Sequence, residues 1–98
     1  MTGIEIIAEE RKRQIEKEGW TPEHDDQHKE WELSCAAQHY IDAAAAKFFG
    51  MLDWKRLPFG WPWSVDWWKP SEDPIRNLAK AGALIAAEID RLQRLNGK

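Results

Sequence analysis

The sequence predicts an all-α fold: a single helical domain over residues 1–98, with three main helices and a Trp- and Pro-rich connection between the second and the third. Three observations support this prediction. Apolar residues recur at helical spacing in three long segments, residues that start or stop helices flank those segments, and 98 residues have room for one core only. Because such a core buries only about two-thirds of the unfolded surface, we expect the chain to form an oligomer.

The first helix is expected over residues 2–18. Thr2 and Glu5 have capping-box spacing, and Gly19 suits the left-handed conformation that ends many helices. One face of this helix changes from apolar to polar along its length, and we expect it to point inward: Ile4, Ile7, Ala8, Arg11, Gln14, Ile15 and Glu18. Residues 19–27 contain Gly, Pro and adjacent acids, which predicts a loop or a single turn.

The second helix is expected from about residue 28 to residue 49, with Gly50 as its stop. Its periodicity predicts a core face made of Leu33, Ala36, Ala37, Tyr40, Ile41, Ala44 and Phe48. The third helix is expected over residues 74–95, with Asp73 as N-cap and Pro74 at the first helical position. Its predicted core face repeats at alternating spacings of three and four: Ile75, Leu78, Gly82, Ile85, Ile89 and Leu92.

Charge and hydropathy exclude two classes of partner. The net charge is −3, and residues 1–32 hold ten acidic side chains against five basic ones. No basic stripe is visible, so we do not expect binding to duplex nucleic acid. No apolar run reaches the roughly 20 residues that span a bilayer, so no membrane partner is expected. A single Cys and the lack of a leader pattern favour a cytoplasmic location.

The polar half of the first helix carries the first candidate site, Arg11, Gln14 and Glu18. The guanidinium of Arg11 suits phosphate or carboxylate, and Gln14 offers a donor and an acceptor to a base or a sugar. The alternative is structural, because Arg11 could instead pair with an acid from another helix.

The segment WTPEHDDQH (residues 20–28) crowds four possible metal ligands into five residues: His24, Asp25, Asp26 and His28. Such side chains can bind a divalent metal ion whose coordination a phosphate substrate then completes, although no strict metal signature is matched. Alternatively, Asp25 or Asp26 caps the second helix. A further polar set on that helix is interpreted as a solvent-exposed face rather than a zinc site: His28, Glu32, Cys35, His39 and Asp42. Glu88 is likewise interpreted as an exposed charge.

The connection over residues 51–72 contains five of the seven Trp. Indole rings offer flat surfaces on which bases stack, and a neighbouring lysine can meet a phosphate. The candidates here are Trp63, Trp67, Trp68 and Lys69, together with Trp20 in the earlier loop. The alternative, which composition favours, is that the tryptophans fill the core or form a dimer interface.

Four segments carry a resemblance to known proteins: ERxRQIxxEGWTxEHDDxH at residues 10–28, WPW at 61–63, WWKP at 67–70 and KAGALIxAEI at 80–89. By these segments the chain resembles a family of short uncharacterised phage and prophage proteins. The resemblance covers nearly the whole chain. One departure is the run Lys29-Glu30-Trp31, where the family commonly has a Gly before the Glu-Leu pair. The resemblance implies a protein located in the cytoplasm of an infected or lysogenic bacterium.

The sequence and this resemblance together lead to one main hypothesis: the chain binds a nucleotide-like molecule without turnover and so sequesters a host immune signal, such as a cyclic nucleotide. No cofactor and no catalytic residue is expected in that case. A weaker similarity to MazG-like all-α nucleotide pyrophosphatases gives the enzymatic alternative, in which clustered acids would hold magnesium. A third alternative is an inhibitor that docks its Trp-rich connection on a host protein.

Overall fold

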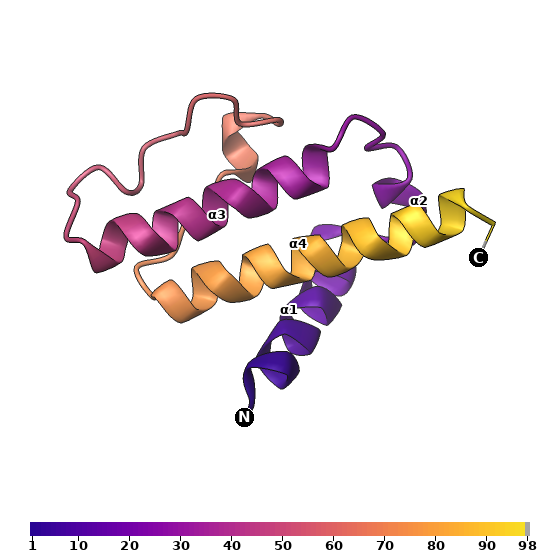
Figure 1. The fold of residues 1–98 in the computed structure, drawn as a ribbon, viewed down its shortest axis with the longest axis horizontal. Coiled ribbons are helices and arrows are strands. Elements are labelled where there is room, and N and C mark those ends of the chain that lie inside the picture. Colours follow the sequence, from indigo (N-terminus) through magenta and orange to yellow (C-terminus); the bar gives the residue numbers. More distant parts are fainter. Residues whose placement is uncertain (98) are drawn as a thin grey trace.

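A computed structural model describes residues 1–97, and this part of the chain is all-helical, as predicted (Figure 1). Three long helices are present, α1 (Gly3–Glu18), α3 (Glu32–Phe48) and α4 (Pro74–Leu95). Two short elements join them: the single turn α2 (Pro22–Asp25), inside the predicted loop, and a 3-10 turn, η1 (Val65–Trp67), inside the Trp-rich connection. The sequence did not predict η1.

The α3 and α4 helices lie side by side and run in opposite directions, while α1 crosses α4 and projects beyond it (Figure 1). The connection between α3 and α4 folds back along α3, so Trp61 lies against Tyr40 in the middle of that helix. The molecule is flat, with principal extents of 44 × 32 × 22 Å. One consequence is that a large share of each helix faces solvent.

The predicted ends of α1 and α4 are confirmed. The Thr2 hydroxyl accepts from the Glu5 backbone N–H at 3.2 Å, and the Glu5 carboxylate accepts from the Thr2 N–H at 2.9 Å. Gly19 ends α1 with a φ of 73°, a left-handed conformation that glycine adopts without strain. At α4, the Asp73 carboxylate accepts from the Ile75 N–H at 2.9 Å. Local capping chemistry therefore sets these boundaries.

The start of α3 differs from the prediction, because the helix begins at Glu32 rather than near residue 28. The residue before it, Trp31, has a φ of 67° and makes no side-chain capping hydrogen bond. The interpretation of Asp25 or Asp26 as a cap of this helix is therefore wrong. A left-handed Trp is strained because its Cβ approaches the backbone.

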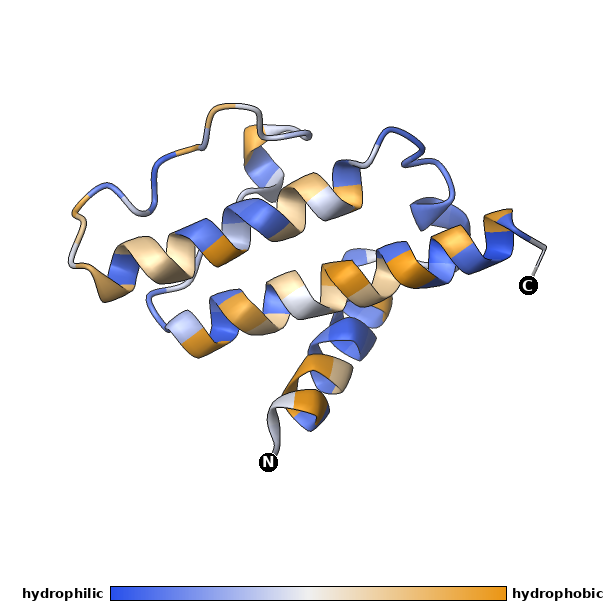
Figure 2. Cartoon of the chain, viewed as in Figure 1, coloured by the Kyte–Doolittle hydropathy of each residue, from blue (hydrophilic) through white to orange (hydrophobic). Residues whose placement is uncertain are grey.

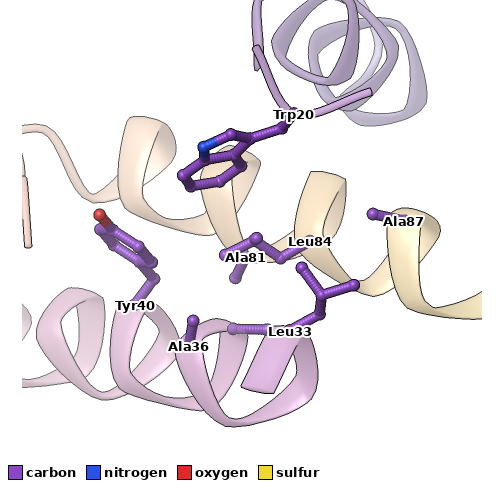
Figure 3. Close-up of a cluster of buried hydrophobic side chains, with 8 residues drawn as sticks. Trp20, Leu33, Ala36, Tyr40, Ala81, Leu84 and Ala87 are labelled. Carbon is purple, nitrogen blue, oxygen red and sulfur yellow. The ribbon is translucent and has the colours of Figure 1, made fainter. Parts of the chain in front are cut away.

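The core lies where α3, α4 and the Trp20 loop meet (Figure 3). Trp20 and Tyr40 supply the large rings, which lie beside Leu33, Leu84 and a set of alanines on both helices. The predicted core face of α3 is confirmed at Leu33, Ala36, Ala37, Tyr40 and Ala44. It is wrong at its far end, where Ile41 is 42% exposed and Phe48 is 81% exposed.

The predicted core face of α4 is wrong. Four of its residues are 43–60% exposed and form what we call the α4 stripe: Ile75, Leu78, Ile85 and Ile89. Figure 2 shows such apolar segments recurring along the helix. Gly82 and Leu92 are only partly buried. The buried face of α4 instead carries alanines, Leu84 and polar side chains, because α3 packs closely through small residues and pairs its Ser34 with Glu88. The interpretation of Glu88 as an exposed charge is wrong too.

The expected inward face of α1 is confirmed only in part. Gln14 is buried, whereas Ile4 and Ala8 are exposed because the start of α1 projects past α4 (Figure 1). Within residues 1–97, no helix has the length and apolar character needed to cross a membrane.

Candidate ligand-binding site

A hollow of about 240 Å³ opens between the α2 turn and the Trp-rich connection, and we call it the aromatic pocket. Its volume is below the roughly 300–1,000 Å³ of sites for drug-sized ligands, so it suits one ring system rather than a whole dinucleotide. Six residues line it, five of them aromatic: Trp20, His24, His28, Trp63, Ser64 and Trp67.

Local structure places each wall of the aromatic pocket. Thr21 is the N-cap of α2 and its hydroxyl accepts from the His24 N–H at 3.3 Å, which holds the turn that carries His24. On the opposite side, Ser64 is the N-cap of η1, and the Trp67 N–H donates to the Ser64 carbonyl at 3.0 Å. Two capped turns therefore face each other across the hollow.

The rings meet mostly at an angle. Trp20 lies parallel to His24, with centroids 6.5 Å apart, and it is tilted against Trp63 at 5.5 Å and Trp67 at 5.8 Å. His28 completes the set at 4.8 Å from His24 and 5.1 Å from Trp63. Such packing gives the pocket apolar, polarizable walls that favour a flat aromatic guest.

Three buried nitrogen atoms of these lining residues have no hydrogen-bond partner: His24 Nδ1, His28 Nε2 and Trp63 Nε1. Buried polar atoms are nearly always paired, so each unpaired one calls for an explanation such as a water molecule or a ligand. The indole nitrogen can only donate, whereas each neutral imidazole can offer either a donor or an acceptor at the free position. All three atoms are shielded from solvent, and His24 Nδ1 lies 3.7 Å from Asp25 Oδ1, so a guest reaches them only after the covering side chains move.

Arg11 and Asp25 lie beneath the pocket. Asp25 is fully buried, and Arg11 Nη2 donates to its Oδ2 at 2.7 Å while Nη1 donates to the Trp20 carbonyl at 3.1 Å. The alternative interpretation of Arg11, a pair with an acid from another helix, is thus confirmed. Asp26 is engaged as well, with Arg94 of α4 at 2.7 Å. These two ion pairs hold the α2 turn against α1 and α4.

A network of charged groups lies on the other side of Trp20 and Trp67. Arg13 makes a two-pronged contact with Glu10, at 2.9 and 2.7 Å, and reaches Glu18 at 3.0 Å. Glu18 also pairs with Lys69 at 3.4 Å, and the Gln14 amide donates to Glu10 at 3.3 Å. The space inside this network is about 10 Å³, room for roughly one water molecule. It is a packed polar core rather than a second pocket.

Lys80 and Tyr40 extend this network into the interior. Burial, reinforced by the positive charge of Arg76, lowers the pKa of Lys80 to about 8. Burial likewise raises the pKa of Tyr40 to about 12. The Tyr40 hydroxyl accepts from the Lys69 N–H at 3.1 Å, and Lys80 Nζ donates to the Lys69 carbonyl. Lys69 is therefore held at its backbone while its side chain remains partly exposed, with Nζ 5.1 Å from the Trp67 ring.

Of the residues predicted as ligand-binding, Trp20, His24, His28, Trp63 and Trp67 come together in the aromatic pocket. Gln14, Glu18 and Lys69 lie in the adjoining network, and Arg11, Asp25 and Asp26 support the α2 turn. Trp68 does not join them. It packs on Tyr40 and Trp61 and lines a different, wide hollow of about 760 Å³ between α3 and the connection.

The polar set on α3 is the predicted solvent-exposed face only in part, because Asp42 is exposed and the other members are half-buried. Cys35 and His39 are half-buried because the connection covers them: the Cys35 thiol donates to the Gly60 carbonyl at 3.5 Å, and His39 lies 6.1 Å from the Trp61 ring. His28 belongs to the aromatic pocket. Across residues 1–97, no three His, Cys, Asp or Glu side chains are grouped so that they could hold a metal ion.

Sequence reasoning missed five residues of the site: Ser64, Tyr40, Lys80, Glu10 and Arg13. Glu10 and Lys80 had one available signal, because both fall inside the segments 10–28 and 80–89 that the sequence analysis singled out. Tyr40 was assigned to the core, which is correct, but its hydroxyl also binds the backbone beside the pocket. No family model, curated protein or solved structure matches this chain.

Proposed function

We propose that this chain binds a small molecule with a nucleobase-like ring in the aromatic pocket, and that it holds the ligand without converting it. The observation that carries the proposal is a hollow with five aromatic walls whose three buried ring nitrogens have no hydrogen-bond partner. Every base offers a π face to such walls, and stacking on an aromatic side chain contributes about 1–3 kcal/mol per base.

The walls and the unpaired nitrogens together favour a base over a purely apolar guest. An apolar ring would leave the nitrogens of His28 and Trp63 buried and unsatisfied, which costs about 1–3 kcal/mol for each group. A nucleobase carries donors and acceptors along its edge and can pair with them once the side chains that cover them move aside. Its ring also fits the size of the pocket, so that sugar and phosphate groups would lie outside.

Lys69 is the cation best placed to meet a phosphate outside the pocket. Its ammonium group lies over the Trp67 ring, and within residues 1–97 its only anionic contact is a 3.4 Å pair with Glu18 in which Lys69 is half-exposed. Exposed pairs of this kind are weak, so a phosphate could compete for the lysine. Arg11, in contrast, would have to leave a fully buried carboxylate.

The ion pairs of the buried acidic side chains favour binding without turnover. Each acidic side chain in the interior already contacts a cation, which neutralises the charge a catalytic magnesium ion would need: Glu10, Glu18, Asp25 and Glu88. The resemblance to small phage proteins then suggests a biological role, sequestration of a nucleotide signal of the bacterial host.

The test measures binding of the four nucleoside monophosphates and their cyclic forms by calorimetry and by quenching of Trp fluorescence, with and without magnesium. The Trp67→Ala variant removes one wall at the rim, and we expect it to weaken binding at least about 10-fold. His28→Ala removes an unpaired nitrogen and should alter the preference among bases. Trp54→Ala is the matched control, because Trp54 lies outside the aromatic pocket against Lys47 and Lys55.

Two results would overturn the proposal. One is the lack of any heat or quenching with all of these compounds at millimolar concentration. The other is a loss of binding in Trp54→Ala but not in Trp67→Ala, which would move the site to the wide hollow under the connection. Recovery of each compound by chromatography tests turnover separately, since magnesium-dependent conversion would favour the pyrophosphatase alternative.

A further inference from the structure

The wide hollow between α3 and the Trp-rich connection is a second candidate site. Its volume is about 760 Å³, against about 240 Å³ for the aromatic pocket. That volume falls within the roughly 300–1,000 Å³ of sites for drug-sized ligands. The two hollows share no lining residue, so a ligand in one does not occupy the other.

Hydrogen bonds fix the outer wall of this hollow. Residues 53–56 and residues 58–61 each close a turn with one backbone hydrogen bond, of 2.9 and 3.2 Å. The first turn is tied to the end of the connection, because Trp68 Nε1 donates to the Lys55 carbonyl at 2.9 Å. The second turn is tied to α3 by the thiol hydrogen bond of Cys35. The hollow is therefore built into the folded connection.

Charged side chains reach the hollow from both of its walls. Asp42 comes from α3, and Asp53 and Arg56 come from the first turn of the connection. Within residues 1–97 none of the three takes part in an ion pair. All three are exposed, so a ligand can reach their carboxylate and guanidinium groups without breaking a contact inside the protein.

The charges around the hollow balance. Lys47 lies beside it, with Nζ 5.3 Å from the Trp54 ring that forms part of the lining, and so adds a second positive charge to that of Arg56. An anionic ligand would lie close to Asp42 and Asp53, and a cationic ligand would lie close to the two bases. Because juxtaposed like charges are costly, both kinds of ligand are disfavoured.

A neutral ligand rich in hydroxyl groups suits this lining. Each hydroxyl both donates and accepts, so one molecule can donate to a carboxylate and accept from a guanidinium. Apolar rings lie next to these groups: Trp61 and Trp68 are half-buried with their centroids 4.9 Å apart, and Phe59 is fully exposed at 102%. Such rings offer flat apolar surfaces to the C–H face of a sugar ring.

We infer that the wide hollow is a binding site for a short neutral saccharide. Trp61, Trp68 and Phe59 contact its C–H faces, while Asp42, Asp53 and Arg56 hydrogen-bond its hydroxyls. This site is separate from the aromatic pocket and takes a different class of ligand. Because its polar groups are exposed to water, we expect a dissociation constant on the order of millimolar.

The experiment is fluorine NMR on the full chain labelled with fluorotryptophan, titrated with cellobiose, maltose and diacetylchitobiose. Each Trp signal is assigned by its loss in a Trp→Phe variant. The saccharide should shift the signals of Trp61 and Trp68 and leave those of Trp20 and Trp63 in place. Inorganic phosphate and tetramethylammonium serve as charged probes, and neither should shift the Trp61 or Trp68 signal.

Two variants test the contacts. Asp42→Asn removes one exposed carboxylate and should weaken saccharide binding about 10-fold or more, since hydrogen bonds to charged groups are the stronger ones. Its matched control is Asp90→Asn, because Asp90 is an exposed acid on α4 outside the hollow. Phe59→Ala removes a fully exposed ring and should weaken binding about 3-fold or more while leaving the core intact.

Three results would overturn this inference. The first is an unchanged Trp61 and Trp68 signal with every saccharide at about 50 mM, far above the expected dissociation constant. The second is a shift with phosphate or tetramethylammonium but not with a saccharide. The third is an Asp42→Asn variant that binds as tightly as Asp90→Asn. Nucleotide binding is measured at the other hollow, so the failure of either proposal leaves the other standing.

Discussion

Replacing Arg11 by Met should strongly destabilise the fold, because it removes the only hydrogen-bonding partner of the buried Asp25 carboxylate within residues 1–97. Asp25 is fully buried, its Oδ2 accepts from Arg11 at 2.7 Å, and its Oδ1 already has no hydrogen-bond partner. Loss of one member of a buried ion pair costs about 3–5 kcal/mol, since the other charge stays behind without compensation. The lost hydrogen bond to the Trp20 carbonyl adds about 1 kcal/mol.

This cost is large compared with the total. A domain of this size is stable by about 5–15 kcal/mol, so Arg11→Met could remove half of the free energy of unfolding. At roughly 4–8 °C for each kcal/mol in a domain of this size, the melting temperature should fall by about 15–50 °C. The carboxylate cannot easily reach water instead, because Thr21 caps one end of its turn and Arg94 ties Asp26 to α4.

The assay is urea and thermal unfolding followed by circular dichroism. Three variants separate charge from packing. Arg11→Met combined with Asp25→Leu removes both charges and should recover a large part of the loss, because well-packed apolar residues often replace a buried pair without penalty. Arg94→Met breaks a partly exposed pair with Asp26 and should cost about 1 kcal/mol or less.

The reasoning is refuted if Arg11→Met lies within about 1 kcal/mol of the wild-type chain, the size expected of an exposed pair. It is also refuted if the double variant loses as much stability as the single one. In that case packing of the Arg11 side chain, rather than the stranded carboxylate, would dominate.

Three further predictions concern backbone strain, a close contact and pH. Trp31→Gly should raise stability by about 0.5–1 kcal/mol, because Trp31 has a φ of 67°, and a lower melting temperature would contradict this. Gly82→Ala should destabilise the fold by about 1–2 kcal/mol, since the new Cβ would lie 2.6 Å from Ile7 Cδ1. In an Ile7→Ala background the same substitution should cause no clash. If Gly82→Ala costs as much stability in that background as in the wild-type chain, the contact with Ile7 is not the cause. Stability should rise from pH 8 to about 10, because over this range the unfolded chain binds the Lys80 proton that the folded chain has released. It should then fall toward pH 12, because Tyr40 keeps its proton in the folded chain and loses it in the unfolded chain. Urea midpoints that decline steadily above pH 8 would disprove this.

Helix termini could be predicted from the sequence because capping is local. Thr2, Glu5 and Gly19 act within one turn of the α1 ends, and Asp73 acts within one turn of the α4 start. The start of α3 could not be predicted in the same way. It is set by Trp31 in a left-handed conformation, which neighbouring sequence does not favour and which only the surrounding packing can hold.

The candidate site was predictable as a set of residue types but not as a geometry. Indoles in two separate segments indicated a stacking surface, whereas His24 and His28 were interpreted as possible metal ligands; the structure brings five of these rings together. Which aromatic ring joins the pocket depends on how the connection folds back over α3. That is why adjacent Trp67 and Trp68 line different hollows, one facing Trp20 and the other facing Tyr40 and Trp61.

By itself the sequence determined the all-α class, the three long helices and most of their ends, because periodicity and capping operate over a few residues. Only the tertiary structure decided which face of α4 is buried. An amphipathic pattern shows that a helix has an apolar face, but it does not show what covers that face. In this chain α3 packs on α4 through alanines and the Ser34–Glu88 hydrogen bond, and α1 crosses α4 at Gly82. The contacts that bury the other faces of α4 use close backbone approach and ion pairing, so the α4 stripe stays exposed.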